Sequence, residues 1–368
     1  MEKIVILPGD GIGQDVIEVS VPIFKALGLH FELQNGGIGW QYWVNEGNPI
    51  PKKTWELVRD SDAVLLGAIT SKPANDAINE LSKDIDENTK YVSPVIQLRQ
   101  NLDLFANVRP IISYNKNKKF EFYIIRENTE GLYSGLDFRP IPEELVDFIK
   151  SDSNRFKDIS SNNSVATIRL ITEYGFDRLL KFSSEWAISH GKTNIVIADK
   201  PNVFRNSSSL IFELIQKYSK IYPQLHYKIE NVDAVGMWMI KKPEKYEVIV
   251  CENQFGDILS DVGAGIMGGL GVAYSGNFGS NNLSYFEPVH GSAPKYAGLN
   301  KANPIAMFLS IAMMLEHLNY KKESSAIERA VRKAVGNTNY RTFDLLGLAS
   351  LKESANYIIK QAVKFNEK

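Results

Sequence analysis

Asp257 and Asp261 lie four residues apart, directly before a run crowded with glycine. If this segment is helical, the spacing brings both side chains to one face, with about 5–6 Å between their Cβ atoms. A hard divalent cation such as Mg²⁺ or Mn²⁺ takes oxygen ligands of this kind and keeps positions open for water and substrate. Taken alone, such a pair is more often a solvated helix face.

The position of the two aspartates favours the metal site. The preceding segment 246–251 is rich in β-branched residues and is predicted to be a buried strand. A strand followed by Gly256 and a helix brings the aspartates to the carboxyl edge of a sheet, where α/β proteins build their sites. Asp233 is a third acid that could complete the metal site, although by itself it says little.

Three arginines, Arg99, Arg109 and Arg126, follow one another at short intervals. A guanidinium group binds a carboxylate through two parallel hydrogen bonds, so three converging arginines would suit a substrate with several carboxylates. Individually, each is more often a surface or ion-pair residue.

Two further side chains could move protons. Tyr133 follows Arg126 by seven residues and could donate a proton, and its pKa near 10 would need lowering by nearby cations. Lys200 follows the predicted strand 195–198 and could bridge Tyr133 or a metal-bound water. A packing tyrosine and a solvated lysine are the commoner cases for either residue alone.

Two loops rich in small residues could hold a nucleotide. The loop 9–13 follows the first predicted strand, as a phosphate loop would, but Gln14 stands where the dinucleotide fingerprint needs glycine. In the second loop, a base could stack on a histidine, and a phosphate could pair with a lysine and a tyrosine. This loop, 286–298, contains His290, Lys295 and Tyr296.

Strand-like and helical patterns alternate along the chain, which predicts a mostly parallel sheet with helices on its faces. The polar segment 142–163 is predicted to be an exposed arm, and the apolar segment 305–315 a buried helix, in the core or at a subunit interface. The predicted strands are 4–7, 30–33, 63–66, 120–125 and 193–198, and the predicted helices are 15–27, 53–59 and 177–190.

The composition narrows the class of protein. The 368 residues are enough for two domains, and 42 basic residues against 43 acidic ones argue against a nucleic-acid or membrane-surface protein. There is neither an apolar run long enough for a membrane span nor a signal-peptide pattern, so the expected location is the cytoplasm. Cys251 lies in a predicted apolar strand and is expected to be a buried, unreactive thiol.

Taken together and in this order, the motifs resemble the metal-dependent β-decarboxylating dehydrogenases, which include isocitrate, homoisocitrate and 3-isopropylmalate dehydrogenases. The resemblance runs from 9–13 to 342–345. It implies a two-domain, non-Rossmann α/β fold of the isopropylmalate-dehydrogenase type, with the active-site cleft between the domains. The large cofactor-binding domain would comprise 1–104 and 268–368, and the small domain 105–267 would contain the metal ligands and a dimerisation arm at 134–172.

The resemblance also implies a role for each candidate residue. The three arginines would hold the carboxylates of a small di- or tricarboxylic hydroxy acid, and Mg²⁺ or Mn²⁺ would bind Asp257 and Asp261. Asp233 and Lys200 are expected from the other subunit of a homodimer, and Tyr133 would protonate the enol left by decarboxylation. The cofactor-binding residues would be Thr70, His290, Gly291, Lys295, Tyr296 and Asn303.

The cofactor and the substrate depend on a few positions. NAD-dependent relatives typically have an aspartate where Lys295 stands, so NADP is expected and NAD is less favoured, although Phe343 and Gly347 replace a tyrosine and an arginine of the NADP enzymes. Ser93 matches a serine of the isocitrate enzymes, but Val95 replaces their asparagine. This stretch is more similar to that of homoisocitrate dehydrogenases, but Lys295 and Tyr296 resemble the isocitrate enzymes. Isocitrate leads narrowly on that ground, ahead of homoisocitrate and 3-isopropylmalate.

A hypothesis from another class is a non-catalytic regulatory subunit on the same fold. Such subunits tend to lose site residues, whereas this chain keeps the whole candidate set. Pro201, where relatives usually have alanine, is the one nearby departure.

Overall fold

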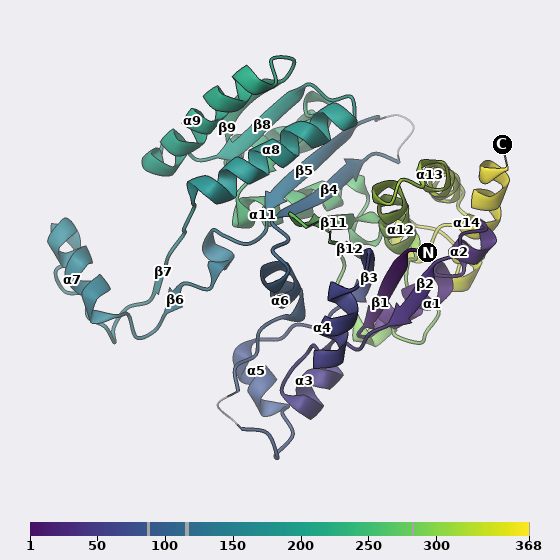
Figure 1. Cartoon of the computed structure of the whole chain (residues 1–368), viewed down its shortest axis with the longest axis horizontal. Coiled ribbons are helices and arrows are strands. Elements are labelled where there is room, and N and C mark those ends of the chain that lie inside the picture. Colours follow the sequence, from purple (N-terminus) through teal and green to yellow (C-terminus); the bar gives the residue numbers. More distant parts are fainter. Residues whose placement is uncertain (87–88, 115–117, 282, 368) are drawn as a thin grey trace.

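One mixed β-sheet crosses the part of the protein that the computed structural model describes, which is residues 1–367 apart from 87–88, 115–117 and 282 (Figure 1). Its ten strands are β1 (Lys3–Gly9), β2 (Glu32–Asn35), β3 (Ala63–Ala68), β4 (Ala106–Ile112), β5 (Glu121–Glu127), β8 (Asn194–Asp199), β9 (His226–Asn231), β10 (Val248–Cys251), β11 (Tyr274–Phe278) and β12 (Ser284–Pro288). Their order across the sheet is β2-β1-β3-β12-β11-β4-β5-β10-β8-β9.

The sheet is parallel towards both edges, as predicted, and antiparallel in the middle. There β11 runs antiparallel to both β12 and β4, and β4 runs antiparallel to β5. The sequence patterns missed β4, β9, β11 and β12. In β4 the obstacle is Pro110, which has no N–H to donate and is rare inside sheets; it pairs with β5 beyond the stretch of β4 that pairs with β11.

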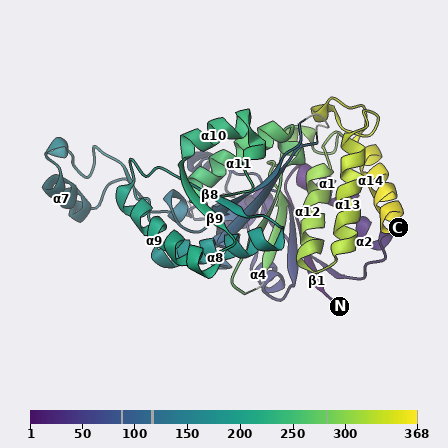
Figure 2. The same ribbon diagram turned by 90° about the horizontal axis from the view of Figure 1, so that it is seen from above.

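The helices cover both faces of the sheet, and Figure 2 shows the segments 232–241 and 253–267 on one side and 173–189 on the other. They are α1 (Ile12–Ser20), α2 (Ile23–Ala26), α3 (Trp40–Glu46), α4 (Lys52–Arg59), α5 (Ala74–Asn79), α6 (Pro94–Asn101), α7 (Glu143–Asp152), α8 (Glu173–Ser189), α9 (Arg205–Ile221), α10 (Val232–Lys241), α11 (Asn253–Met267), α12 (Ile305–His317), α13 (Lys321–Val335) and α14 (Leu351–Asn366). The predicted helix 15–27 is two helices, because Pro22 separates them.

The chain itself buries α12. Every residue from Ile305 to Leu315 is buried, and the helix packs on β3, β11, β12 and α13. The prediction of a buried helix is therefore confirmed, and no subunit interface is needed to cover it. Cys251 is also buried, as predicted, and burial raises the pKa of its thiol.

An arm extends away from the body of the molecule (Figure 1). It contains α7 and an antiparallel pair of short strands, β6 (Asp137–Phe138) and β7 (Ala166–Thr167). Several of its apolar side chains are exposed, Phe148 by 64%. The predicted excursion is confirmed, and its exchange with a partner stays a prediction. In the described part of the chain, no helix has both the length and the apolar character needed to span a membrane.

The strands of the two predicted domains occupy separate halves of the sheet. The segments 1–104 and 268–368 provide the five strands from β2 to β11, and 105–267 provides the five from β4 to β9. The sheet and the main hydrophobic core continue across this division. The α/β architecture is as expected, and the division into domains stays a prediction.

Candidate active site

A strand pair and a helix bring together four of the predicted site residues. Arg109 lies on β4 and Arg126 near the end of β5, while Asp257 and Asp261 lie on α11, which packs against both strands. Gly256 permits the close approach of α11, because a Cβ there would lie 2.6 Å from Cβ and Cγ of Arg126. The helix predicted from the spacing of the aspartates is therefore confirmed, but it begins at Asn253, so Gly256 lies inside the helix rather than before it.

Asp257 is shared between three partners. Its Oδ1 forms an ion pair with Nη1 of Arg126 and lies 3.8 Å from Nη2 of Arg109, and its Oδ2 accepts a 2.9 Å hydrogen bond from the hydroxyl of Tyr133. Burial alone would raise the pKa of Asp257, but Arg126 and Arg109 outweigh it and lower the pKa below its usual range. The carboxylate is therefore anionic at neutral pH.

Asp261 is the more open of the two acids, with 64% of its side chain exposed against 38% for Asp257. Its Oδ1 lies 3.7 Å from Nη1 of Arg109, and burial raises its pKa, an effect that Arg109 opposes and Asp257 reinforces. Two carboxylates on one helix face, one of them open to solvent, fit the oxygen ligands that Mg²⁺ or Mn²⁺ prefers. These two residues could hold such a cation.

The three predicted arginines converge. Arg99 lies on α6, where its Nη2 pairs with Oε1 of Glu287 at 3.1 Å and its Nε donates to the hydroxyl of Tyr285 at 3.0 Å. Burial lowers the pKa of Arg126, and the charges of Arg109 and Arg99 lower it further. Three buried guanidinium groups that repel one another form a site that an anion would stabilise.

Asparagines hold two of these arginines in place. Oδ1 of Asn253 accepts hydrogen bonds from Nε and Nη2 of Arg126 at 2.9 and 2.7 Å, and Oδ1 of Asn107 accepts one from Nε of Arg109 at 3.0 Å. Sequence reasoning missed both asparagines, and it also missed Glu287. Asn253 and Glu287 stand inside motifs that the sequence singled out, whereas Asn107 gives no local signal.

The net shift in the pKa of Tyr133 is upward, not the lowering that the sequence reasoning required of a proton donor. The guanidinium of Arg126 lies 5.2 Å from the centre of the Tyr133 ring and lowers its pKa. Burial and the neighbouring Asp257 outweigh this cation, so the pKa of Tyr133 is raised. The phenol is therefore protonated at neutral pH, the state that a proton donor requires.

Lys200 and Asp233 form a pair of their own. Nζ of Lys200 lies 2.7 Å from Oδ1 of Asp233, which lies in the first turn of α10. Among the described residues, no group of three or more His, Cys, Asp or Glu side chains could hold a metal ion. Within one chain, Asp233 is thus not gathered with Asp257 and Asp261, and its supply from a second subunit stays a prediction.

Ser93 and Val95 stand at the start of α6, the helix that contains Arg99. Ser93 immediately precedes the helix, and Val95 lies one turn before Arg99. Both are partly exposed, and Val95 also packs against the smaller of two hydrophobic clusters. Their roles towards a substrate stay predictions.

The two loops predicted to hold a nucleotide meet in space. A Cβ on Gly11, whose φ is +52°, would lie 2.2 Å from the carbonyl oxygen of Ser292, so only glycine fits there. The hydroxyl of Thr70 lies 2.6 Å from that of Ser292, and Asp10 accepts a 2.8 Å hydrogen bond from the Thr70 N–H. Asp10, which sequence reasoning gave no role, thereby orients Thr70 towards the second loop.

His290 has an unused ring nitrogen. Its Nδ1 lies 3.0 Å from the carbonyl oxygen of Gly291, while its buried Nε2 has no hydrogen-bond partner among the residues described. Burial lowers the pKa of His290, so the imidazole is neutral at pH 7. A neutral, partly exposed ring with an unsatisfied nitrogen fits a site for a nucleotide base.

The other predicted cofactor residues differ in how far they are buried. Asn303 is buried and donates a 2.9 Å hydrogen bond to Asp344. Lys295 and Tyr296 are exposed, and Lys295 forms no ion pair within the described part of the chain. The ring of Tyr296 lies 5.8 Å from that of Phe343, beside a hollow of about 600 Å³. This loop could hold the phosphorylated end of a dinucleotide.

Comparisons with known proteins agree with this geometry. The sequence model of the family described as isocitrate/isopropylmalate dehydrogenase matches residues 3–361. A Legionella pneumophila protein named DlpA is 47% identical over 99% of this chain, which spans 59% of DlpA. A homoisocitrate dehydrogenase of Methanocaldococcus jannaschii is 36% identical, over 98% of this chain and 99% of its own. The crystal structure of an isocitrate dehydrogenase from Methylococcus capsulatus superposes with a TM-score of 0.83 at 30% identity, covering 98% of this chain and 99% of that one.

Proposed function

Because this chain belongs to the isocitrate/isopropylmalate dehydrogenase family, we propose that it catalyses the metal-dependent oxidative decarboxylation of a 3-substituted malate, with NADP as the oxidant. Isocitrate is the first candidate substrate, with 2-oxoglutarate and CO₂ as products. The family consists of oxidatively decarboxylating dehydrogenases.

The observation that carries the proposal is the convergence of Arg99, Arg109 and Arg126 beside Asp257 and Asp261. The three positive charges are balanced by these two aspartates and Glu287. A divalent cation on the aspartates would release Arg109 and Arg126 for other anions. Two guanidinium groups beside a cation then suit a hydroxy acid with several carboxylates.

The mechanism follows from what each side chain can do. When bound, the metal supplies a Lewis acid and NADP accepts a hydride. The arginines hold the carboxylates and so fix the carbon that carries the hydroxyl. A base acting through Lys200, from the second subunit, removes the hydroxyl proton. Tyr133, which is protonated at neutral pH, returns a proton to the carbon that loses CO₂.

A site shared between two subunits is supported by the missing third metal ligand in a single chain. Lys200 and Asp233 lie together, but no third acid joins Asp257 and Asp261 among the described residues. The arm also exposes apolar side chains, including Phe148, that a partner would cover. We therefore infer a homodimer with two shared sites.

The preference for NADP rests on Lys295. This lysine is exposed and unpaired in the described structure, so its ammonium is free to meet a ribose phosphate. Tyr296 stands beside it, and Phe343 replaces a hydrogen-bonding side chain, which weakens the expected grip on the phosphate. NADP is preferred over NAD on these grounds.

Two residues at the start of α6, Ser93 and Val95, bear on the choice of substrate. Ser93 can donate a hydrogen bond to a third carboxylate, which favours isocitrate over 3-isopropylmalate. Val95 presents an apolar surface beside it, and the homoisocitrate dehydrogenase of M. jannaschii is 36% identical. These two observations make homoisocitrate the second candidate.

The decisive experiment measures reduced nicotinamide with isocitrate, homoisocitrate and 3-isopropylmalate, each with NADP or NAD and with Mg²⁺ or Mn²⁺. The highest kcat/KM is expected for isocitrate with NADP, with activity lost on chelation and restored by metal. A higher kcat/KM with another acid would reassign the substrate. No turnover with any of the three would favour the regulatory-subunit hypothesis instead.

A further inference from the structure

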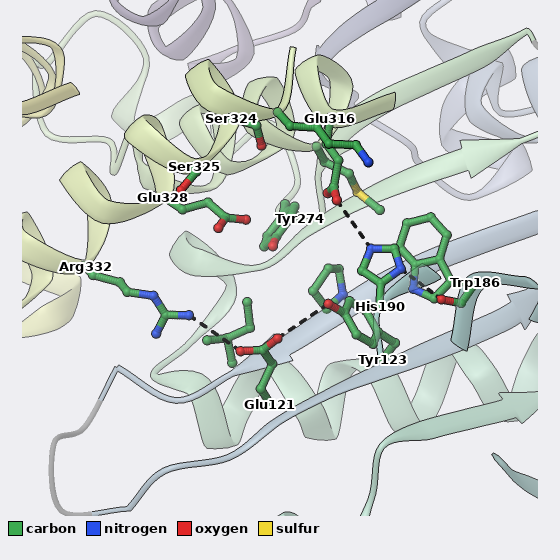
Figure 3. Close-up of a pocket in the computed structure, with 14 residues that line it drawn as sticks. Glu121, Tyr123, Trp186, His190, Tyr274, Glu316, Ser324, Ser325, Glu328 and Arg332 are labelled. Carbon is green, nitrogen blue, oxygen red and sulfur yellow. Dashed lines mark hydrogen bonds and ion pairs between the residues drawn. The ribbon is translucent and has the colours of Figure 1, made fainter. Parts of the chain in front are cut away.

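Strands β4 and β5, which hold two arginines of the candidate active site on one face of the sheet, present other side chains on the opposite face. In an antiparallel pair, directly opposed residues project to the same side of the sheet. Asn107 is opposite Arg126 on the face of the arginines. Pro110 is opposite Tyr123, and Ile112 is opposite Glu121, on the other face. These last four residues line a hollow of about 200 Å³ between β4, β5, α8, α12 and α13 (Figure 3).

Two polar groups in this hollow have no partner. The carboxylate of Glu328 on α13 makes no hydrogen bond or ion pair within the described part of the chain. Tyr274 on β11 is only 4% exposed, and its hydroxyl likewise has no hydrogen-bond partner among the described residues. Both side chains project into the hollow in Figure 3. Ser324 lies one turn before Glu328 and also lines it.

The ends of the hollow are closed by polar contacts of two acids. At one end, Glu121 lies 3.7 Å from Arg332 and 3.9 Å from Lys192. At the other end, Nε2 of His190 lies 3.6 Å from Glu316. The carboxylates of Glu121 and Glu316 therefore have partners, which leaves Glu328 as the acid without one in the centre of the hollow.

The walls between these ends are aromatic. The rings of Trp186 and His190 stack at 4.2 Å, and the ring of Tyr123 lies 5.1 Å from that of His190. Aromatic faces attract a cation that lies over them. The hollow thus combines an unpaired acid, an unpaired hydroxyl and aromatic walls.

We propose that this hollow is a binding site for a small organic cation, whose protonated primary amine is held by Glu328 and Tyr274. An ammonium group offers three donors, which can meet the Glu328 carboxylate and the hydroxyl oxygens of Tyr274 and Ser324. An alkyl stem then packs on Trp186 and Met313. At roughly 30 Å³ for each water displaced, the volume suits a ligand of a few carbon atoms rather than a nucleotide.

The charges around Glu328 favour a cation over an anion. Burial raises the pKa of Glu328, Glu316 raises it further, and Arg332 only partly opposes them. Glu121 also raises this pKa, and His190 lowers it. A bound ammonium would offset the burial and ionise the carboxyl, whereas an anion would meet an acid that no cation compensates. Lys321 and Arg332 also line the hollow and are the groups that an anion would have to use.

The hollow joins the two halves of the sheet. Glu121 and Tyr123 come from 105–267, and Glu316 and Glu328 come from 268–368. A ligand that bridges these halves acts on β4 and β5, whose other face holds Arg109 and Arg126. We therefore expect it to change KM for the acid substrate; this effect rests on the proposed function, whereas binding does not.

Titration calorimetry on the full chain tests binding, with n-butylamine and 1,4-diaminobutane as probes and n-butanol as the neutral control. Both amines should bind more tightly than the alcohol. Glu328→Gln should weaken amine binding about tenfold or more, and Tyr274→Phe should weaken it a few-fold. The matched control Glu323→Gln, on the same helix but outside the hollow, should leave the affinity unchanged.

Equal affinity for butylamine and butanol, or unchanged amine affinity in Glu328→Gln, would overturn the proposal. Tighter binding of acetate than of either amine would do the same.

If Glu328→Gln does not fold, the unaltered protein still provides a test. At about pH 5, amine binding should release protons, seen as a heat that depends on the ionisation enthalpy of the buffer. Binding without proton release contradicts the role of Glu328. A loss of turnover with all three acids would leave these binding results standing.

Discussion

The hydroxyl of Tyr133 donates a 2.9 Å hydrogen bond to Oδ2 of Asp257, so the proposed proton donor contacts a proposed metal ligand directly. Arg126 pairs with the other oxygen of Asp257 and lies over the Tyr133 ring. The acid raises the pKa of the phenol by more than the guanidinium lowers it. Tyr133 therefore keeps its proton at the pH where Asp257 has lost its own.

Replacing Tyr133 with phenylalanine should separate two steps of the reaction. Overall turnover should fall by about 10²–10⁴, the usual contribution of a positioned acid or base. Reduction by NADPH of the β-keto acid that corresponds to the substrate should persist, because that step does not need the phenol. Both rates are followed by nicotinamide absorbance. Tyr174→Phe, at a largely exposed tyrosine, should leave both unchanged. Equal loss of both steps would contradict a role in protonation alone.

A complementation assay tests whether the site is shared between subunits. Tyr133→Phe and Lys200→Met should each inactivate the homodimer, but a hybrid dimer would contain one site with neither change. Random pairing should then restore about a quarter of the unaltered activity. Co-expression with two different tags allows the hybrid to be purified and assayed. If each site belongs to one subunit, every site lacks one residue and no activity returns.

Replacing only one member of the buried pair Arg99 and Glu287 should destabilise the folded protein. Arg99→Met leaves the Glu287 carboxylate buried without its cation, and we expect a loss of about 3 kcal/mol in the free energy of unfolding. Urea denaturation measures the loss. The double variant Arg99→Met with Glu287→Gln should regain part of it, because no unpaired charge is left. Equal stability of the single and double variants would show that the pair contributes through packing only.

Replacing Lys295 with aspartate should reverse the cofactor preference. Lys295→Asp removes the positive charge offered to a ribose phosphate and provides an acceptor for ribose hydroxyls, so kcat/KM should fall for NADP and rise for NAD. The ratio of the two values is the measurement. Lys322→Asp, at an exposed lysine of α13, makes the same charge change outside the cofactor loop and should leave the ratio unaltered. A preference of the unaltered protein for NAD would refute the NADP proposal.

His290 should make the protein less stable in mild acid. Its pKa is lowered in the folded state, so the unfolded chain takes up a proton first as the pH falls below about 6.5. The stability that the neutral imidazole provides is complete above that pH and is lost as the pH falls towards the folded-state pKa. Thermal unfolding between about pH 7 and pH 5 should show a shallower decline in His290→Gln. An identical decline would mean that the ring is not buried in solution.

Local spacing made part of the site predictable. The interval between Asp257 and Asp261 predicts one helix face, and the β-branched run predicts the strand before it, whereas Gly256, expected to precede the helix, lies inside it. These features depend on residues a few positions apart. The roles of the arginines and the two loops were inferred from the order of the motifs, and the family match supports the resemblance itself. The arm was predicted from the polar composition of 142–163.

What the sequence did not reveal depends on distant contacts. Glu287 pairs with Arg99 across 188 positions, and no local pattern announces such a partner. The sequence reasoning required nearby cations to lower the pKa of Tyr133, but burial and Asp257, 124 positions away, together raise it. The central strand β4 was not predicted because it contains Pro110. A proline is tolerated at this position because β11 stops pairing with β4 before it, a contact that no local pattern reveals.

The shared carboxylate of Asp257 has a thermodynamic consequence. Arg109, Arg126 and Tyr133 already occupy it, so an arriving cation must displace them. A carboxylate substrate that takes over the arginines removes this competition, and a cation on the aspartate in turn frees the arginines for the substrate. Each ligand therefore raises the affinity for the other by the same factor. The two form a cooperative pair, and the apparent dissociation constant of the metal falls as the acid is added.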